Sequence, residues 1–293
     1  MQILENEGFR AAVDPQGAEL TSLCSKTTGT EYVWQADPTV WKRHAPILFP
    51  IVGRLKDGSY TVGGKSYQIT QHGFGRDLAW QAERIADNCV ELTLCADEHT
   101  KTMYPWAFRC TVRYTLEGAS LKKEHIVENC SDTPMYYELG GHDGYTVCWL
   151  PDERVEDYAV EFEGVEALHP ILLDENVLLS RDHGTLPLEN GQLPLTRETF
   201  RADAIISDDL PVRRASIVGR KNGRRVTMEF PDFPYFAVWS PYKDFDVPFV
   251  CLEPWSSLPD GGYLDHALEN KVGVRVLQSG ASETLTFITT IHE

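Results

Sequence analysis

The chain has 293 residues, 42% of them hydrophobic, and carries 44 acidic against 27 basic residues, for a formal net charge of −17. This size suits one large all-β domain as well as two small domains. The acidic balance disfavours binding to nucleic acid or anionic lipid, and no segment approaches the ~18 uninterrupted apolar residues of a membrane helix, which leaves small neutral molecules as the expected partners.

The N-terminal sequence and the cysteines point to the cytoplasm. The first ten residues, MQILENEGFR, contain acidic side chains and lack a basic region followed by an apolar stretch, so they do not resemble a signal peptide. The seven cysteines form no C-x-x-C pair, and several lie in apolar strand-like runs, where reduced thiols behave as small hydrophobic side chains. The sequence is compatible with a monomer or a homodimer.

Short strand-like segments follow one another along almost the whole chain. They are rich in Val, Ile, Thr, Tyr and Phe and are bounded by Gly, Pro, Asn or Asp. In chain order they are AELTSLCS (18–25), YTVGGKSYQIT (60–70), CVELTLCA (89–96), FRCTVRYTLEG (108–118), SLKKEHIVENCS (120–131), RVTMEFP (225–231), YFAVWSP (235–241), FVCLEPW (249–255), GVRVLQ (273–278) and ETLTFITTI (283–291).

These segments predict an all-β fold. Helical periodicity is nearly absent, and only ALENKV (267–272) is expected to make a single turn. Antiparallel strands at this spacing predict large stacked sheets, in a sandwich or barrel, within one domain over residues 1–293. The segment 170–195, with mixed polarity and several prolines, is expected to run as a long excursion over the surface.

The stretch YYELGGHDGYTV (136–147) is strand-like but contains three glycines around His142. Core packing gives no reason for such a cluster, whereas glycines mark places where a turn, a bulge or a ligand needs room. We therefore expect the strand to be interrupted at Gly140 and Gly141, and His142 to be functional.

Glu253 follows an apolar strand and precedes a proline, so we expect it at the end of the strand, facing a cleft or water. A carboxylate among apolar and aromatic neighbours is costly to bury without a partner. It is either the structural partner of an arginine or a general base whose pKa is raised by desolvation.

Other candidates have ordinary structural explanations beside the functional ones. His72, in QHGFGRD, is most simply a hydrogen-bonded, half-buried histidine. Arg54, in VGR, is either a surface cation or an anchor for substrate hydroxyls or a carboxylate. Trp239 and Trp255 belong either to the core or to a wall on which a sugar ring stacks.

Several reaction classes lack their motifs. The chain contains no G-x-S-x-G, no P-loop and no H-E-x-x-H, and the glycines at 73 and 75 precede no helical pattern. A metal site formed by His72, His142 and Glu253 is chemically possible, but their spacing does not demand one. Glycoside hydrolysis needs a second carboxylate beside Glu253, and Asp203 is the candidate.

An ordered set of motifs resembles the aldose 1-epimerase (galactose mutarotase-like) family, in particular its less characterised bacterial branch. The motifs are WQADPTVWKRHAPILFPIVGRLKDGSY, QHGFGRDLAW, ELGGHDGY, VWSPY and VCLEPWSSLPD. The resemblance implies a very large antiparallel β-sandwich of the galactose mutarotase type. It also implies an isomerase that interconverts the α and β anomers of a hexose such as galactose or glucose, with no metal or redox cofactor.

The resemblance also implies roles for individual residues. His142 would donate a proton to the ring oxygen of the sugar, and Glu253 would take the proton of the C1 hydroxyl. Arg54, His72 and Asp203 would bind sugar hydroxyls. Trp239, selected from its own sequence context, is the candidate for the aromatic wall.

One departure concerns the residue after the catalytic histidine. The family commonly has proline there, whereas this chain has Asp143, which we expect either to orient the imidazole and raise its pKa or to alter the choice of sugar. Three alternatives remain: a hexose-6-phosphate 1-epimerase in which Arg54, Arg76, Lys42 and Arg43 gather, a non-catalytic carbohydrate-binding or sensor protein, and a glycoside hydrolase or lyase.

Overall fold

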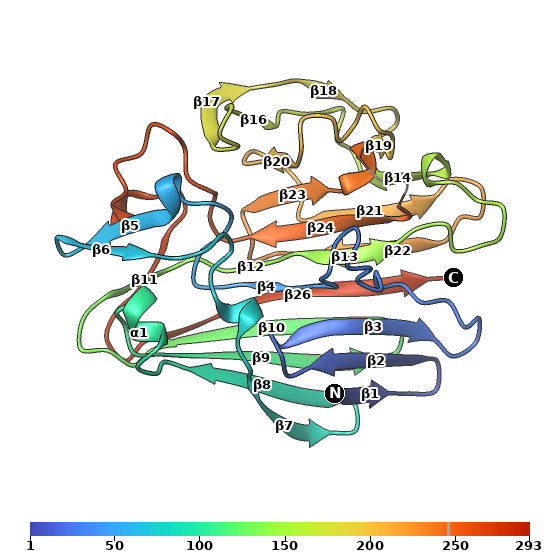
Figure 1. Cartoon of the computed structure of the whole chain (residues 1–293). Helices are drawn as coiled ribbons and strands as arrows, with labels where there is room; N and C mark the ends of the chain where they lie inside the picture. The colour runs from blue at the N-terminus through green and yellow to red at the C-terminus, as the bar shows by residue number, and fades with distance from the viewer. Residues whose placement is uncertain (245–246) are drawn as a thin grey trace.

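The computed structural model describes residues 1–244 and 247–293, and its regular secondary structure is almost entirely antiparallel strands (Figure 1), which confirms the all-β prediction. The largest sheet has nine strands. Their order is β19 (Gln192–Pro194), β14 (Tyr158–Glu161), β21 (Arg214–Gly219), β22 (Arg225–Glu229), β26 (Ser282–His292), β10 (Ser120–Asn129), β9 (Phe108–Glu117), β8 (Cys89–Cys95) and β7 (Gln81–Ala86).

A second layer consists of a six-stranded and a three-stranded sheet. The six-stranded sheet has the order β20 (Ile205–Ser207), β23 (Tyr235–Trp239), β24 (Phe249–Trp255), β12 (Gly140–Gly141) and β4 (Ile47–Leu48), with β13 (Asp143–Thr146) also paired to β24. The three-stranded sheet is β1 (Gln2–Glu5), β2 (Phe9–Asp14) and β3 (Glu19–Ser25).

The residue pattern of the strands reflects their place in these layers. Along β10, buried residues alternate with partly exposed ones, as expected for a strand with one face on the core and one toward water. Every residue of β24 is buried, because both of its faces are covered. The main core cluster draws on the chain from Leu4 to Ile291.

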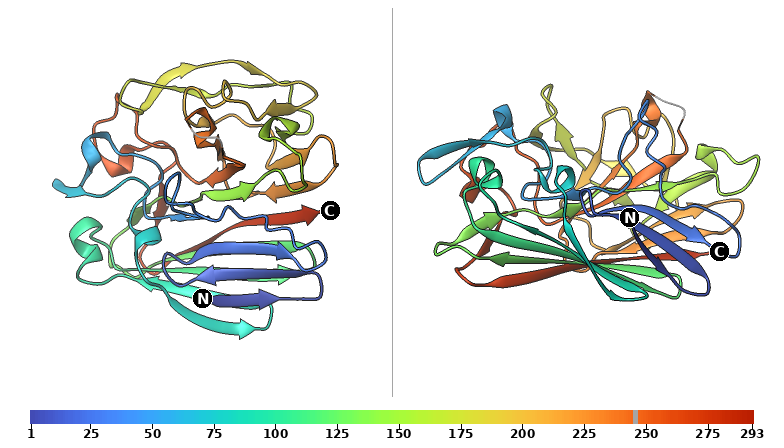
Figure 2. Two further views of the ribbon diagram at one scale, coloured as in Figure 1. Left: turned by 45° about the vertical axis from the view of Figure 1, so that its right-hand side comes forward. Right: turned by 60° about the horizontal axis from the view of Figure 1, so that its bottom comes forward.

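Smaller elements project from the side opposite the nine-stranded sheet (Figure 2, right). The hairpins are β5 (Ser59–Val62) with β6 (Lys65–Gln68), and β16 (Ile171–Leu173) with β17 (Leu179–His183). Two further pairs are β11 (Met135–Tyr137) with β25 (Arg275–Leu277), and β15 (Ala167–Leu168) with β18 (Leu186–Pro187). The helical elements are α1 (Thr100–Met103) and the 3-10 turns η1 (Lys56–Gly58), η2 (Gly75–Asp77), η3 (Val155–Asp157), η4 (Pro241–Lys243) and η5 (Leu268–Asn270).

Three local expectations are corrected. The run 136–147 is interrupted, but at 138–139 and at His142, because Gly140 and Gly141 themselves form β12, which pairs with both β24 and β4. Glu253 does not end its strand, since β24 continues through Pro254 to Trp255. The segment 170–195 is not a plain excursion, because it contains the β16–β17 hairpin.

The single turn expected in 267–272 is present as η5. None of the seven cysteines, which all lie in the described part of the chain, forms a disulfide. Among the residues that the structure describes, no helix has the length and apolar character needed to cross a membrane.

Candidate functional site

His142 and Glu253 are neighbours across two adjacent strands. The cross-strand pairs Gly140–Trp255 and Asp143–Leu252 continue one register without a shift. His142 lies between β12 and β13 and therefore falls opposite Glu253 in β24. Because side chains alternate between the two faces of a sheet, His142 and Glu253 share one face, and Asp143 lies on the other. The Nε2 atom of His142 lies 3.3 Å from the Oε2 atom of Glu253.

Burial shifts both groups away from their charged forms. His142 is 8% exposed and Glu253 is 1% exposed. Loss of water around the imidazole lowers the pKa of His142 to about 3, and the cations of Arg76 and Arg43 add to this effect. Burial, reinforced by the carboxylate of Asp203, raises the pKa of Glu253 well above its ordinary value.

The pair therefore holds one transferable proton over a wide pH range. A neutral imidazole beside a protonated carboxyl group and an imidazolium beside a carboxylate differ only in the position of that proton along the 3.3 Å contact. In either form, one group can donate a proton while the other accepts one. This is the combination that general acid–base catalysis requires.

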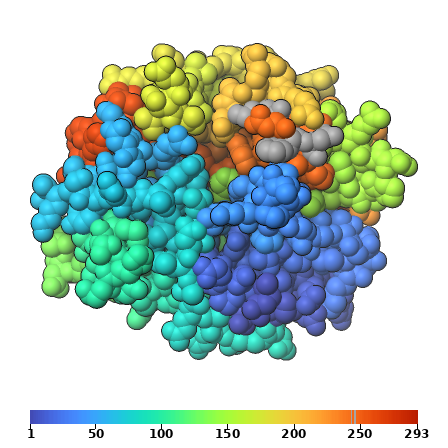
Figure 3. Space-filling model, in the orientation of Figure 1, coloured from blue at the N-terminus to red at the C-terminus, as the bar shows by residue number. Residues whose placement is uncertain are grey.

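The pair lies in a cavity of about 350 Å³, which we call the inner cavity. The hollow on the face shown in Figure 3 lies between the cyan segment near residue 70, the olive segment near residue 175 and the orange strands. All six residues selected from the sequence line the inner cavity. Its lining comprises Trp41, Gly53, Arg54, Gln71, His72, Arg76, His142, Leu173, Val177, Asp203, Ala204, Ile206, Trp239, Glu253, Trp255 and Pro259.

A backbone N–H group decides which ring nitrogen of His72 carries the proton. The N–H of Gly53 donates to its Nδ1 atom at 3.0 Å, and burial lowers the pKa of His72 well below the ordinary value. The neutral imidazole therefore carries its proton on Nε2, 3.2 Å from the side-chain amide of Gln71. For this contact to be a hydrogen bond, the oxygen of that amide and not its nitrogen must face His72.

Two tryptophans form the aromatic wall around the imidazole of His142. The ring of Trp41 lies 5.0 Å from it and the ring of Trp239 lies 5.5 Å from it, centroid to centroid. Such a wall offers an apolar face to the C–H side of a sugar ring.

The glycines around His142 accommodate aromatic side chains. A Cβ atom added at Gly144 would lie 2.9 Å from Cζ3 of Trp41, and one at Gly140 would lie 2.8 Å from Cδ1 of Trp255. None of the three glycines lines the inner cavity. The expectation that a ligand approaches these glycines is therefore corrected, because tryptophans of the cavity wall occupy the space at Gly140 and Gly144, and Phe287 occupies it at Gly141.

Asp143 does not orient the imidazole, contrary to one expectation from the sequence. Its carboxylate forms a buried ion pair with Lys123 and accepts a hydrogen bond from Tyr145 at 3.1 Å. The pKa of the neighbouring His142 is lowered rather than raised.

A buried charge cluster positions the segment that carries Gly53 and Arg54. The ammonium group of Lys271 binds Asp260 at 2.7 Å and Glu138 at 3.4 Å. Glu138 accepts the N–H of Val52 at 2.8 Å, and Asp260 donates its N–H to the carbonyl of Arg54 at 2.9 Å. The cluster thus ties two walls of the inner cavity together.

Three cavity residues carry buried polar atoms that have no hydrogen-bond partner within the described part of the chain. These atoms are Nδ1 of His142, Nε of Arg76 and Nε1 of Trp255. The indole N–H of Trp255 lies close enough to Glu253 to oppose part of the pKa shift there, yet makes no hydrogen bond of good geometry. Because buried polar groups are normally paired, these atoms favour a polar ligand in the inner cavity.

The residues that could hold a metal differ from the trio that the sequence made chemically possible. Ligand atoms of His142, Cys251 and Glu253 lie within 4.8 Å of one another. Cys251 takes the place that the sequence suggested for His72, because Cys251 and Glu253 are two positions apart on β24 and so share a face.

Sequence reasoning missed Trp41, Gln71 and Val177 as parts of the site. Trp41 and Gln71 lie within or beside motifs that were recognised, but nothing in their local pattern separates them from core or surface residues. Val177 belongs to the segment between β16 and β17, which was expected to run over the surface.

Comparison with known proteins places these features in a family. The profile of the aldose 1-epimerase family matches residues 1–267. The chain is 34% identical over 298 residues to the chromosomal protein LacX of Lactococcus lactis subsp. lactis, an alignment that covers 99% of each chain.

Solved structures from two lactobacilli are also similar. A galactose mutarotase related enzyme from Lactobacillus acidophilus superimposes with a TM-score of 0.94 at 32% identity and covers 100% of this chain and 97% of its own. A galactose mutarotase-like protein from Lactobacillus casei ATCC 334 superimposes with a TM-score of 0.91 at 30% identity and covers 100% of both chains. The mutarotase-type fold expected from the sequence is thereby confirmed.

Proposed function

Because the chain belongs to the aldose 1-epimerase family, we propose that it interconverts the α and β anomers of an aldohexose such as glucose or galactose. The observation that carries this proposal is the 3.3 Å contact between His142 and Glu253 in a cavity of about 350 Å³. A volume of this order lies at the lower end of ligand pockets, ~300–1,000 Å³, and suits one pyranose ring.

The reaction needs two proton transfers and no net change in composition. In the imidazolium–carboxylate form of the pair, Glu253 accepts the proton of the C1 hydroxyl while His142 gives a proton to the ring oxygen O5, and the C1–O5 bond breaks to leave an open-chain aldehyde. After rotation about C1–C2, O5 attacks the other face of the carbonyl and the two proton transfers run in reverse. Each positioned transfer contributes about 10²–10⁴-fold.

The other cavity residues bind and orient the sugar in this proposal. Arg54 and Asp203 contact hydroxyl groups, the Nε2–H of His72 donates to a third, and Trp239 with Trp41 packs against the ring. The unpaired N–H of Trp255 provides a further donor beside Glu253.

The test is the rate at which freshly dissolved α-D-glucose and α-D-galactose reach equilibrium, followed by polarimetry. The protein should accelerate this approach above the buffer rate in proportion to its concentration. Sugar binding detected by NMR without any acceleration would replace the enzyme by a carbohydrate-binding protein.

A second candidate is a hexose-6-phosphate 1-epimerase, which one observation favours. Arg54 and Arg76 both line the inner cavity, and burial, together with the cation of Arg43, lowers the pKa of Arg76 to about 10. A phosphate group paired with this buried guanidinium would offset the cost of its burial. A kcat/KM for glucose 6-phosphate above that for glucose, lost in Arg76→Met, would establish this candidate.

A further inference from the structure

Cys251 lies beside the proton-transfer pair, although the proposed reaction gives its thiol no role. Ligand atoms of Cys251, His142 and Glu253 lie within 4.8 Å of one another, and all three residues are buried. His142 and Glu253 line the inner cavity, whereas Cys251 does not. A thiol, an imidazole and a carboxyl group thus meet at one place, with the cavity on one side of them.

We propose that these three side chains bind one Zn²⁺ ion, or a similar sulfur-binding divalent cation such as Cd²⁺, and that the bound ion inhibits the enzyme. Binding of the ion is independent of the proposed function. The inhibition rests on the proposed function, because it takes His142 and Glu253 to be the groups that transfer protons.

The strands hold the three side chains on one face of the sheet. Cys251 and Glu253 are two positions apart on β24, so their side chains point the same way. His142 falls opposite Glu253, and the residue opposite Cys251 is Gly144, which has no side chain to place beside the thiol. Because sites built on strands hold their geometry better than sites on loops, the donors are close together before any ion binds.

The distances fit a tetrahedral zinc site. Ligand atoms bound to Zn²⁺ at about 2.0–2.3 Å lie about 3.3–3.8 Å from one another. The contact between Nε2 of His142 and Oε2 of Glu253, at 3.3 Å, already has this length. The sulfur of Cys251 lies within 4.8 Å of both partners, so a movement of about 1 Å brings it into the same range.

The charges of the three groups match a divalent cation. Binding needs the thiolate of Cys251, the carboxylate of Glu253 and a neutral His142, so the two anions neutralise both positive charges of the ion. Two protons leave on binding, one from the thiol and one from the pair of His142 and Glu253. A complex without net charge suits this position, because burial penalises an uncompensated charge.

The donor set selects the kind of ion and explains the inhibition. Thiolate and imidazole are ligands of Zn²⁺, whereas Mg²⁺ and Ca²⁺ prefer oxygen atoms. Three protein ligands leave a fourth tetrahedral position, which a water molecule takes in many zinc sites. Coordination occupies the lone pairs of His142 and Glu253 that accept protons during the proposed reaction, so anomerisation should stop.

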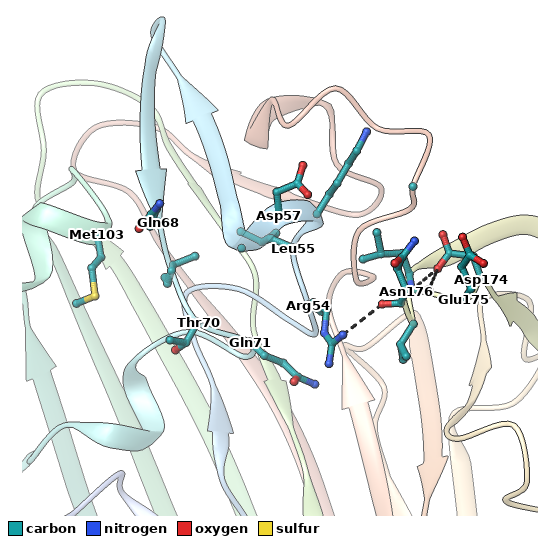
Figure 4. A pocket seen from close by; sticks show the side chains of 16 residues that line it. Arg54, Leu55, Asp57, Gln68, Thr70, Gln71, Met103, Asp174, Glu175 and Asn176 are labelled. Carbon is teal, nitrogen blue, oxygen red and sulfur yellow. Dashed lines mark hydrogen bonds between the residues drawn. The ribbon is translucent and has the colours of Figure 1, made fainter.

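A second cavity, of about 1100 Å³, adjoins the inner one and gives a cation a path to the site (Figure 4). The residues common to both linings are Arg54, Gln71 and Val177. The second cavity has more acidic than basic side chains. The acidic ones are Asp57, Asp174 and Glu175, and the basic ones are Arg54 and Lys56. This excess, together with the net charge of −17, raises the local concentration of cations.

The first test titrates untagged, metal-free protein with Cd²⁺ and follows the ultraviolet absorption of the bond between Cd²⁺ and a thiolate. The background variant is Cys95→Ser/Cys130→Ser, which lacks the two exposed thiols. It should bind one Cd²⁺ per chain, and Zn²⁺ should displace this ion and remove the absorption.

Cys251→Ala in this background should weaken Cd²⁺ binding at least about 100-fold, since residues that only support a metal ligand already contribute about 10–100-fold. The matched control is Cys110→Ala, which removes another buried thiol and should keep the affinity. Glu253→Gln, which changes no volume, should weaken binding as strongly as Cys251→Ala, and it decides the matter if Cys251→Ala does not fold.

The second test measures inhibition by polarimetry with α-D-glucose, as the ratio of the rates with and without Zn²⁺ in each protein. At a Zn²⁺ concentration that saturates the wild type, its ratio should fall close to zero, and excess EDTA should restore the rate. The ratio should approach unity in Cys251→Ala. Zn²⁺ held at exposed pairs such as His183 with Asp208 would inhibit both proteins equally.

The two tests separate failure of this inference from failure of the proposed function. No thiolate absorption in the background variant, or equal affinity in Cys251→Ala and Glu253→Gln, would overturn the metal site whatever the activity on glucose. Absorption that depends on Cys251 in a protein that anomerises no sugar would establish the site, and the enzymatic function would fail. Anomerisation that Zn²⁺ leaves unchanged or accelerates would refute the inhibition and leave the enzymatic function intact.

Discussion

The carboxylate of Asp143 forms a buried ion pair with the ammonium group of Lys123 on the face of β13 opposite to His142. Lys123 also lies over the rings of Tyr114 and Phe287, with its Nζ atom 5.5 and 5.1 Å from the ring centroids. The pair therefore anchors the strand that carries His142 from within the core.

Removing one member of this pair should be far more harmful than removing both. Lys123→Met leaves the carboxylate of Asp143 buried without its cation, which we expect to lower the free energy of unfolding by about 3–5 kcal/mol. The double variant Lys123→Met/Asp143→Leu should recover most of this loss, because no charge remains uncompensated. Urea unfolding measures both values, and a double variant less stable than Lys123→Met would refute the explanation.

Replacement of either proton-transfer group should abolish most of the activity. Glu253→Gln and His142→Asn remove one acid–base function each, so kcat should fall by about 10²–10⁴-fold, and the double variant should be little worse than the single ones. The surface replacements Glu163→Gln and His183→Asn are matched controls and should keep the wild-type rate. A single cavity variant with wild-type polarimetric activity would disprove the assignment.

The pH dependence should follow the burial of the pair. The acid limb of kcat/KM belongs to His142, whose pKa is lowered to about 3, and the alkaline limb belongs to Glu253, whose pKa is raised. In the free protein, the ring signals of His142, assigned with the His142→Asn variant, should not titrate between about pH 5 and 8. Titration of these signals near the ordinary histidine pKa would contradict the lowered pKa of His142.

Glu253 should make the folded protein less stable as the pH rises. Because its folded pKa is raised, the unfolded chain releases this proton first, so each pH unit above about 4.5 costs about 1.4 kcal/mol until the folded carboxyl group also ionises. Glu253→Gln has no such proton to lose. Its melting temperature should therefore exceed that of the wild type at about pH 8, and the gap should close toward about pH 4.5. A gap independent of pH would show that Glu253 ionises freely in the folded state.

Gly141 should matter for folding and not for sugar binding. A Cβ atom there would lie 2.8 Å from Cζ of Phe287, on the core side of the strand. Gly141→Ala should therefore lower the free energy of unfolding by about 1–3 kcal/mol and leave KM unchanged below the melting transition. Gly8→Ala, at a position where the nearest contact would be 3.9 Å away, is the control. A large rise in KM for Gly141→Ala alone would support the original expectation of ligand contact.

The sequence predicted most strands because a strand-forming composition can be read from a short segment. It failed where the structure depends on strands that are distant in the chain. Runs such as 108–118 and 283–291 carry the branched and aromatic residues of β9 and β26. Pro254 suggested that the strand ends before it. Instead, β24 continues because strands from distant parts of the chain pair with it on both sides. Likewise, Asp143 adjoins His142 in sequence, and only the alternation of side chains places it on the other face.

In the candidate site, too, local motifs could be recognised in the sequence, whereas the spatial arrangement of the residues could not. Ordered motifs shared with a family brought His142 and Glu253 to attention, whereas the register that makes them neighbours depends on β12, β13 and β24 together. Gln71 and Val177 could be assigned to the site only from the structure, which shows that they line its cavities. No local pattern distinguishes an exposed amide at a cavity boundary from one at any other surface.

The cluster of Lys271, Glu138 and Asp260 constrains how this protein can diverge. The carboxylates of Glu138 and Asp260 accept the N–H groups of Val52 and Lys56, and both pair with Lys271. Loss of Lys271 therefore leaves two carboxylates buried without their cation, and loss of either carboxylate removes part of the support of this segment. Variants that reshape this wall should arise through concerted replacement of the trio and not one residue at a time. Libraries that aim to change sugar preference should therefore randomise these three positions together.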